Sequence, residues 1–252
     1  MPCFAHFEID IVSALSSQLV TAFEKLDVGQ LTEAQLNSLE LGQGVYQLFH
    51  KGALVYVGQA QSLKKRLGEH RGKISGRRTI DVADMGFKCL FVHPNWTALA
   101  PENALIKYHR KLGKGTCPWN GNGFGPHDPG RERETTGKPT EGFDAMYPIR
   151  SDWPCIWVKA GEHTAYDLLK SLKGGLPYLL RFETAAPKSQ KPHPDQLTAK
   201  VKVPGEGMTA RDLLSLVARK LPGWQATAFP GHLILYKEHR SYNHGEAIWP
   251  LD

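Results

Sequence analysis

The close spacing of two apolar segments, 44–49 and 54–57, is the strongest constraint on the fold of this chain. A loop of only four residues, 50–53, separates them, and it contains a glycine. Such a connection predicts a β-hairpin of two antiparallel strands. Each strand carries a tyrosine, Tyr46 in the sequence Gly-Val-Tyr and Tyr56 in the sequence Tyr-Val-Gly.

A basic helix is predicted directly after this hairpin. Ser62 is a suitable N-cap residue, and the segment that follows it contains Lys64, Lys65, Arg66 and His70. Because Arg66 and His70 are four residues apart, both side chains project from one face of the helix.

Further elements extend this pattern to an α+β domain over residues 42–150. Residues 85–92 are predicted to form a third strand, and Pro101 is well placed to begin a helix that ends near Leu112. The order ββαβα indicates a small antiparallel sheet flanked by helices. An apolar stripe over residues 9–26 and a potential N-cap at Thr32 predict an N-terminal helical segment, residues 1–41, whose helices serve packing.

The last part of the chain, residues 151–252, contains a weak internal duplication. In both copies a strand leads to a threonine, Thr164 or Thr209, followed three residues later by an aspartate that suits a helix N-terminus. An apolar strand comes after each helix, at 178–182 and 232–236. The pattern predicts a C-terminal α+β domain of two β-α-β units in a small sandwich, for which a ferredoxin-like fold is one candidate.

Composition narrows the class of protein only modestly. Lys and Arg number 31 against 25 Asp and Glu, so the net charge is +6, which fits a polyanionic partner without requiring one. Four widely spaced cysteines without a Cys-x-x-Cys pair suggest reduced thiols. No signal-peptide pattern and no run of about 18 apolar residues is found, so we expect a cytoplasmic location and no membrane partner.

Five motifs in a set order resemble the GIY-YIG nuclease superfamily over roughly residues 42–131. They are Gly-Val-Tyr at 44–46, Tyr-Val-Gly at 56–58, Ser-Leu-Lys-Lys-Arg at 62–66, Glu-x-x-Leu-Ile-Lys at 102–107 and Pro-Trp-Asn at 118–120. His70 and the sequence Gly-Phe-Gly-x-x-Asp-Pro-Gly at 123–130 resemble the restriction-endonuclease branch. The resemblance implies the α+β GIY-YIG core and a catalytic site formed by Tyr46, Tyr56, Arg66, His70, Glu102 and Asn120.

The same resemblance implies a role for most of these residues. Glu102 would ligate one Mg²⁺ or Mn²⁺ ion per active site, although alone it would read as a first-turn carboxylate that complements a helix dipole. Arg66 would contact two phosphate oxygens through its planar guanidinium. Asn120 would orient Tyr46 or neighbouring backbone, with Asn122 as a competing choice, and Tyr56 would support the site.

The general base is left open between two residues. Tyr46 is the superfamily's candidate, but an unperturbed phenol has a pKa of about 10. His70 is the better base on chemical grounds, because the ordinary pKa of histidine is about 6.5. It replaces a tyrosine that is found in many members of the superfamily. We expect the two to act together. The chain also differs from the common pattern of the superfamily at Gln59, where many members have lysine.

Basic residues around the site are candidates for DNA contact or for plain solvated charge. They are Lys64, Lys65, Arg71, Lys73, Arg77, Arg78, Arg131 and Arg133. The last two lie in a segment, 121–150, whose glycines and prolines exclude a regular element. Phe124 and His127 in that segment are further candidates for DNA contact, and a plain interdomain connection is an equal alternative.

Three functions follow from this reading. The first is a type II restriction endonuclease that cuts double-stranded DNA to leave 5′-phosphates, with a homodimer for a palindromic target. The second is a repair or mobile-element nuclease that nicks one strand. The third is a decayed nuclease that binds DNA or protein, for which Gln59 is the best support.

Overall fold

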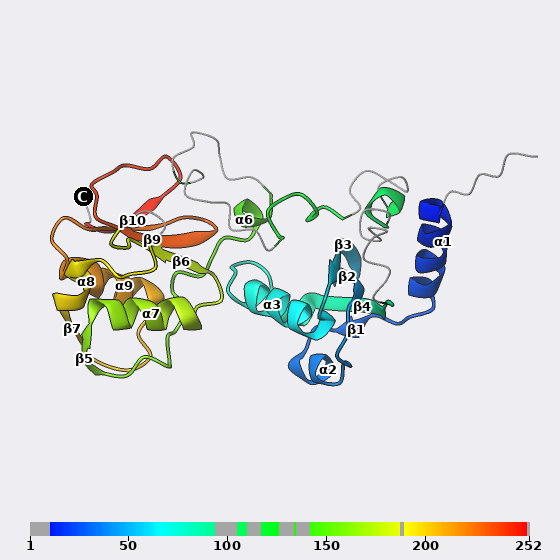
Figure 1. The fold of residues 1–252 in the computed structure, drawn as a ribbon, viewed down its shortest axis with the longest axis horizontal. Helices are drawn as coiled ribbons and strands as arrows, with labels where there is room; N and C mark the ends of the chain where they lie inside the picture. The colour runs from blue at the N-terminus through cyan, green and yellow to red at the C-terminus, as the bar shows by residue number, and fades with distance from the viewer. Residues whose placement is uncertain are drawn as a thin grey trace, which may run out of the picture. The chain divides into compact units, whose positions relative to one another are not determined.

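The structure is a computed structural model that describes residues 11–93, 105–109, 117–125, 134, 142–186 and 189–250. The chain divides into two compact units (Figure 1). The first comprises Met1–Arg71 and Asp81–Gly125, and the second comprises Gly72–Ile80 and Pro126–Asp252. These units differ from the predicted segments 1–41, 42–150 and 151–252, because packing joins the N-terminal helix to the hairpin and residues 72–80 to the C-terminal part.

The first unit is built on a four-stranded antiparallel sheet. Its order is β1 (Gly29–Gln30), β4 (Met85–Phe91), β2 (Gly44–His50) and β3 (Ala53–Ala60). β2 and β3 form the predicted hairpin, with Lys51 and Gly52 in the turn. The third predicted strand is β4, which pairs with the other side of β2 along its whole length. This arrangement is the small antiparallel sheet expected for the α+β core.

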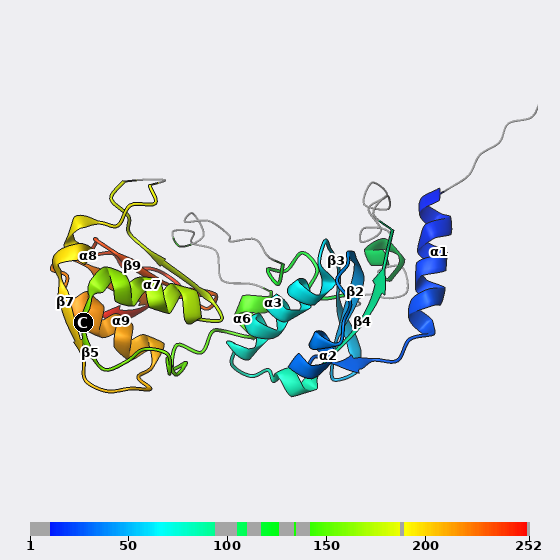
Figure 2. The ribbon, with the colours of Figure 1, turned by 60° about the horizontal axis from the view of Figure 1, so that its bottom comes forward.

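Helices cover the two faces of this sheet. α1 (Ile11–Glu24) packs on one face, where its Leu19 and Phe23 join Val45 and Val57 in one core. α3 (Leu63–Ser75) packs on the other face, and Figures 1 and 2 both show it opposite α1. Residues 105–109 are helical and belong to the α1 side through Leu105. The N-terminal helix is therefore part of the hairpin's own core.

Two short helices complete the first unit. α2 (Glu33–Asn37) begins after Thr32, whose side chain accepts a hydrogen bond from the Gln35 amide, as the N-cap prediction requires. A 3₁₀ turn, η1 (Val82–Asp84), leads into β4. α2 precedes β2 and η1 precedes β4, and neither element carries a predicted site residue.

The second unit contains two sheets. The larger has the order β10 (Glu246–Trp249), β8 (Gln225–Ala228), β9 (His232–Tyr236) and β6 (Leu179–Phe182), with β6 and β9 parallel. The smaller pairs β5 (Gly161–Thr164) with β7 (Lys200–Val203). Its helices are α6 (Phe143–Met146), α7 (Ala165–Gly175), α8 (Pro194–Thr198) and α9 (Ala210–Arg219).

The predicted duplication is visible in the capping of α7 and α9. Thr164 accepts a hydrogen bond from the Asp167 amide, and Thr209 accepts one from the Asp212 amide. The first strands of the two copies, β5 and β7, form the small sheet. The strands predicted to end the copies, β6 and β9, lie in the large sheet, and the second copy has an additional strand, β8, before β9. The strands therefore do not form the single sheet of a ferredoxin-like fold.

Residues 72–80 belong to the second unit because Arg77 is anchored there. Arg77 Nη1 lies 3.0 Å from Asp144 Oδ1 and donates hydrogen bonds to the carbonyl oxygens of Tyr147 and Pro230. Burial lowers the pKa of Arg77, while the nearby Asp144 carboxylate acts in the opposite direction. The ion pair is almost fully buried, so it fixes this segment on the C-terminal fold.

A second buried ionic cluster lies on the large sheet. Glu134 Oε1 accepts hydrogen bonds from Arg181 Nη1 at 2.7 Å, His232 Nε2 at 3.1 Å and the Tyr236 hydroxyl at 3.3 Å. His232 and Tyr236 project from the β9 face that is opposite Leu233 and Leu235. Glu134 is thus tied to the sheet through β6 and β9.

In the part of the chain that the structure describes, no helix is long and apolar enough to cross a membrane.

Candidate active site

Tyr46 and His70 form the centre of the candidate site. Tyr46 comes from β2 and His70 from α3, and the Tyr46 hydroxyl lies 2.6 Å from His70 Nε2. Both residues are buried, with 1% and 2% of their surface exposed. The fold therefore brings a phenol and an imidazole from separate elements into hydrogen-bond contact. The prediction that the two residues act together requires such a contact.

Gly58 makes room for the Tyr46 ring. The two residues face each other across the hairpin, and a Cβ atom added to Gly58 would collide with the Tyr46 ring. Because strand partners project to the same side of the sheet, any larger residue at this position would displace the phenol. The glycine of the Tyr-Val-Gly motif is thus explained by close approach of a side chain.

Arg66 approaches the same phenol from α3. Its guanidinium lies 2.8 Å from Glu69 Oε2 and also hydrogen bonds with Tyr46. Burial lowers the pKa of Arg66, but hydrogen bonds with Glu69 and Tyr46 outweigh this effect and raise the pKa above its ordinary value. The Tyr46 oxygen therefore lies between an imidazole that can accept its proton and a permanent cation that stabilises its anion.

Tyr56 lies at the edge of this pair as an aromatic neighbour. Its ring centroid is 6.0 Å from that of Tyr46 and 5.5 Å from that of His70. The residue is 7% exposed. This position suits the supporting role that the resemblance implied.

Asn120 is buried and binds the backbone of β3. Its Oδ1 accepts a hydrogen bond from the Val57 amide at 2.9 Å, and its Nδ2 donates one to the Val57 carbonyl at 2.7 Å. Val57 is the residue between Tyr56 and Gly58. Asn122, the competing choice, instead donates to the Pro118 carbonyl within its own turn and is exposed. The geometry therefore favours Asn120 as the residue that positions the strand.

Phe124 lies in the interior of the site, although the sequence suggested it as a DNA contact. The side chain is 0% exposed and packs against His70, Tyr56 and Trp119. The breaker-rich sequence around it indicates a loop but does not reveal which side chains the loop buries. Sequence reasoning missed that Phe124 is a neighbour of His70, and the aromatic residue between two glycines was the signal for it.

Some predicted site residues lie outside the described part of the chain. They are Glu102, His127, Arg131 and Arg133. Within the described residues, no group of three or more His, Cys, Asp and Glu side chains could hold a metal ion. Divalent ions such as Mg²⁺ prefer oxygen ligands, and the nearby carboxylate of Glu69 is paired with Arg66. The described cluster therefore does not by itself make a divalent-ion site, and a ligand role for Glu102 stays a prediction.

The basic residues of α3 and its extension differ in availability. Lys64 donates a hydrogen bond to the Asn37 carbonyl, and Lys65 is exposed. Lys73 lies over the Phe143 ring, and Arg71 is half-buried. Arg78 is exposed near Asp152.

Arg77 departs from the predicted set of DNA-contacting residues. It is 4% exposed and its guanidinium is committed to Asp144 and two backbone carbonyls. A side chain held in this way is not available to a phosphate group. We therefore leave it out of the proposed DNA surface.

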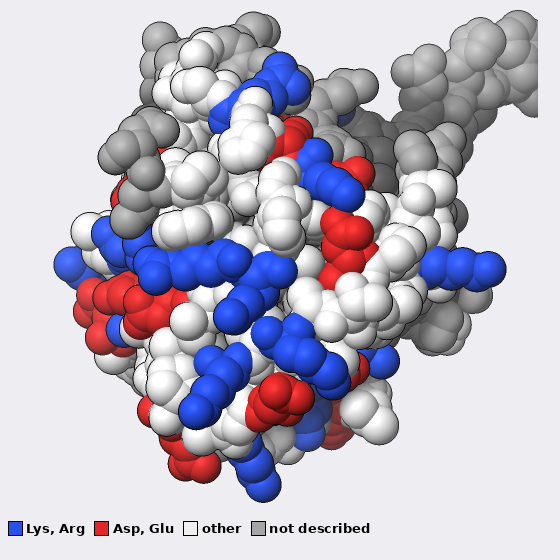
Figure 3. Space-filling view, turned by 90° about the vertical axis from the view of Figure 1, so that its left-hand side faces the viewer, with Lys and Arg blue, Asp and Glu red and all other residues white. Residues whose placement is uncertain are grey.

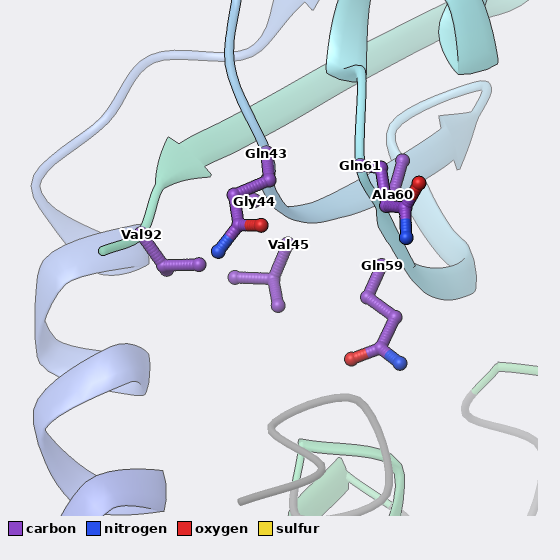
Figure 4. Close-up of a pocket in the computed structure, with 7 residues that line it drawn as sticks. All are labelled: Gln43, Gly44, Val45, Gln59, Ala60, Gln61 and Val92. Atoms are coloured by element: carbon purple, nitrogen blue, oxygen red, sulfur yellow. The ribbon is translucent and has the colours of Figure 1, made fainter. Parts of the chain in front are cut away.

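A hollow of about 260 Å³ opens at the ends of β2 and β3 (Figure 4). Three glutamines, Gln43, Gln59 and Gln61, line it together with Val45 and Val92. Its amides offer hydrogen-bond donors and acceptors but no titratable group. The hollow can therefore contact a polar ligand, but the groups that could exchange a proton are those of the Tyr46–His70 pair.

Figure 3 shows one face of the second unit, where Lys and Arg side chains run across the middle and acidic groups border them. Exposed lysines on this unit include Lys200 and Lys202 of β7. A surface of mixed sign does not favour a polyanion as one continuous basic stripe would. The charge on this face therefore does not identify a DNA-binding surface.

Comparisons with known proteins agree with the fold of the first unit. A family model described as the Eco29kI GIY-YIG domain matches residues 41–155. Residues 41–155 of this chain are therefore a GIY-YIG domain, the domain of a family of DNA endonucleases. Within that family, the model that matches is that of the Eco29kI type.

A second match is to a longer protein. A segment of 82 residues is 39% identical to the UvrABC system protein C of Christiangramia forsetii. The match covers 31% of this chain and 14% of that relative. The chain therefore shares only a small part of that relative's length.

Proposed function

We propose that this chain is a divalent-metal-dependent DNA endonuclease that hydrolyses phosphodiester bonds. The observation that carries the proposal is the Tyr46 hydroxyl held between His70 Nε2 and the Arg66 guanidinium. Hydrolysis requires a group that removes a proton from water and a cation that stabilises developing negative charge. The GIY-YIG domain supplies both within one buried cluster.

In this proposal the proton moves along the hydrogen bond between Tyr46 and His70. His70 begins neutral and accepts the phenolic proton at Nε2, while Arg66 stabilises the phenolate. The phenolate then takes a proton from the water that attacks phosphorus, so Tyr46 is a relay and His70 the final acceptor. Arg66 also contacts the phosphate oxygens. Asn120 and Tyr56 keep the strand and the ring in place.

A divalent ion, Mg²⁺ or Mn²⁺, is part of the proposal, with Glu102 as its protein ligand. When bound, such an ion neutralises charge on the scissile phosphate and on the departing oxygen. One protein carboxylate suffices because Mg²⁺ usually keeps several water ligands. Removal of the ion with a chelator should stop cleavage, and added Mg²⁺ should restore it.

We further propose a type II restriction endonuclease that cuts double-stranded DNA to leave 5′-phosphates. The match to the Eco29kI GIY-YIG domain supports this choice. A chain with one such site would act as a homodimer on a palindromic target, since two strands need two sites. The exposed Lys65 and Arg78, with Lys64, Arg71 and Lys73, are the proposed backbone contacts, together with Arg131 and Arg133.

A cytoplasmic location is also part of the proposal. Within the described residues, Cys89 and Cys155 form no disulfide. Burial raises the pKa of Cys89 to about 11 and that of Cys155 to about 12, so these thiols stay protonated at neutral pH. Such thiols suit a reducing compartment.

The test uses supercoiled plasmid of mixed sequence with Mg²⁺. We expect discrete linear products whose ends a ligase joins without prior phosphorylation. Tyr46→Phe should slow cleavage by about 10²–10⁴-fold, whereas Tyr108→Phe, which removes the same atom in the helix at 105–109, should cut like the parent protein. Equal cutting by the parent and by Tyr46→Phe would refute the proposal.

A nicking nuclease is the second candidate, because the described chain brings together one Tyr46–His70 pair. Nicked circles that never become linear would favour it. DNA binding without any cutting in Mg²⁺ or Mn²⁺ would instead favour a decayed nuclease, in which Gln59 marks the loss of a cation.

A further inference from the structure

Phe124 makes the flattest aromatic contact of the site. Its ring lies nearly parallel to the His70 imidazole, with centroids 4.7 Å apart and an angle of 13° between the planes. The same ring meets Tyr56 edge-on at 5.0 Å and Trp119 at 4.8 Å. One face of the imidazole is therefore covered by Phe124, while its Nε2 faces the Tyr46 hydroxyl.

The chain delivers Phe124 to this place through a tightly turned segment. Gly121 and Gly123 have φ values of +79° and +83°, a left-handed conformation that side chains disfavour. The turn is anchored upstream, where the Trp119 amide donates to the Val55 carbonyl and Asn120 pairs with Val57. The segment is thus attached to β3, the strand that carries Tyr56, before it reaches His70.

A histidine ring needs such a contact to hold one orientation. Rotation about the Cβ–Cγ bond of histidine is broad, so backbone position alone does not fix the plane of the ring. Turning the ring away from its plane would drive its edge into Phe124, because both side chains are buried and the planes are stacked. The stack therefore restricts the imidazole to orientations in which Nε2 meets Tyr46.

We propose that Phe124 is a positioning residue for the reaction, which holds the His70 imidazole in the plane that allows Nε2 to take the Tyr46 proton. It touches neither water nor phosphate in this role. This inference rests on the proposed endonuclease function and deepens it. Once His70 has taken up the proton, the face of the Phe124 ring also stabilises the cation, since aromatic faces attract positive charge.

The alternative is that Phe124 only fills volume in the core. Phe124→Leu keeps most of the apolar volume but removes the flat face. Phe23→Leu is the matched control, because Phe23 is a buried phenylalanine in the core on the other side of the same sheet. Both variants lose a ring from the same unit, and only one of them touches His70.

The experiment compares cleavage kinetics and NMR spectra of the full chain and these two variants. For Phe124→Leu we expect kcat to fall about ten- to a hundred-fold at unchanged KM for DNA, since small misplacement of a catalytic group is costly. The His70 ring protons should lose the shift caused by the neighbouring aromatic face. Phe23→Leu should keep both the kcat and the His70 signals of the parent, after correction for the folded fraction.

Several outcomes decide against the proposal. It is overturned if Phe124→Leu has the parent's kcat, or if Phe23→Leu loses as much at the same folded fraction. Should Phe124→Leu not fold, cross-relaxation between the Phe124 and His70 ring protons of the parent supports the stack, and its absence refutes it. If the parent cuts no DNA, the proposed function fails, and the same NMR measurement still tests the stack separately.

Discussion

Asn120 pairs with both backbone groups of Val57, a residue 63 positions earlier in the chain. The Asn120 side chain thereby provides the two hydrogen bonds that a neighbouring strand would otherwise make with this residue of β3. Val57 separates Tyr56 from Gly58, so the pair holds the strand where the phenol of Tyr46 passes over the glycine. A residue that the motif alone marks as catalytic thus acts, in the folded chain, on the backbone.

Replacement of Asn120 by alanine should lower both stability and activity. The change leaves the Val57 amide and carbonyl without their partner, and each unsatisfied buried group costs about 1–3 kcal/mol. Urea unfolding measures this loss. The control is Asn122→Ala, whose single hydrogen bond lies in an exposed turn, and it should cost less than about 1 kcal/mol. Equal losses in the two variants would contradict the assigned role.

Tyr46 and His70 should behave as one unit in catalysis. Tyr46→Phe and His70→Gln should each reduce kcat by about 10²–10⁴-fold, since each removes one end of the proton transfer. The double variant should be no worse than the more impaired single variant, because groups that act together are not additive. A double variant whose loss equals the product of the two single losses would show that the residues act independently.

Arg66 and Lys65 are neighbours in sequence with different expected effects. Arg66→Lys should lose cleavage strongly, because lysine cannot reproduce the planar contact with both Glu69 and Tyr46. Lys65→Ala should weaken DNA binding slightly and reduce its salt dependence by about one unit of slope. Binding measured across a salt series, together with single-turnover cleavage, separates the two. Similar profiles for both variants would refute the distinction.

Stability of the first unit should fall as the solution becomes acidic. Burial lowers the pKa of His109, and burial and the Lys51 charge lower that of His50 against a smaller opposing effect of Asp84. The unfolded chain therefore takes up protons before the folded chain does, so stability is lost as pH falls from the ordinary histidine pKa toward the lowered values.

Hydrogen exchange of the β2 and β3 amides between about pH 7.5 and about pH 5 measures this loss after correction for intrinsic rates. His109→Gln keeps an amide that can still meet Gln47 and should flatten the dependence. His239→Gln, at an exposed site of the second unit, should leave it unchanged. If stability falls more steeply with decreasing pH in His109→Gln than in the parent, the pH dependence does not come from His109.

Glu134 should be a strong determinant of stability in the second unit. Glu134→Ala leaves the partly buried Arg181 without its carboxylate, and breaking a buried pair costs about 3–5 kcal/mol. Glu246→Ala removes an ion pair with Arg211 on the surface of the same unit and should cost less than about 1 kcal/mol. Chemical unfolding of both variants checks the contrast, and a small loss in Glu134→Ala would show that the cluster relaxes.

Much of the first unit was predictable because its signals are local. The short loop and Gly52 specify the hairpin, Thr32 caps α2, and the spacing of Arg66 and His70 places both on one side of α3. Thr164 and Thr209 similarly mark the start of two helices. Each of these features depends on a few consecutive residues, and the structure confirms them.

Other features depend on segments that are distant in sequence. Arg77 reads as one more charge of a basic helix, yet Asp144 and two carbonyls bury it. Phe124 reads as part of an open loop, yet it stacks on His70. Neither outcome is encoded near the residue itself, because burial is decided by what packs against it.

The sequence by itself determined the hairpin, through its short loop, and the family, through the order of its motifs, since these rest on residue chemistry and short-range geometry. Only the tertiary structure decided that Asn120 holds β3, that Arg77 serves the second unit and that Phe124 covers the imidazole. The physical reason is that hydrogen bonds and ring contacts between distant segments form only once the chain has folded around them.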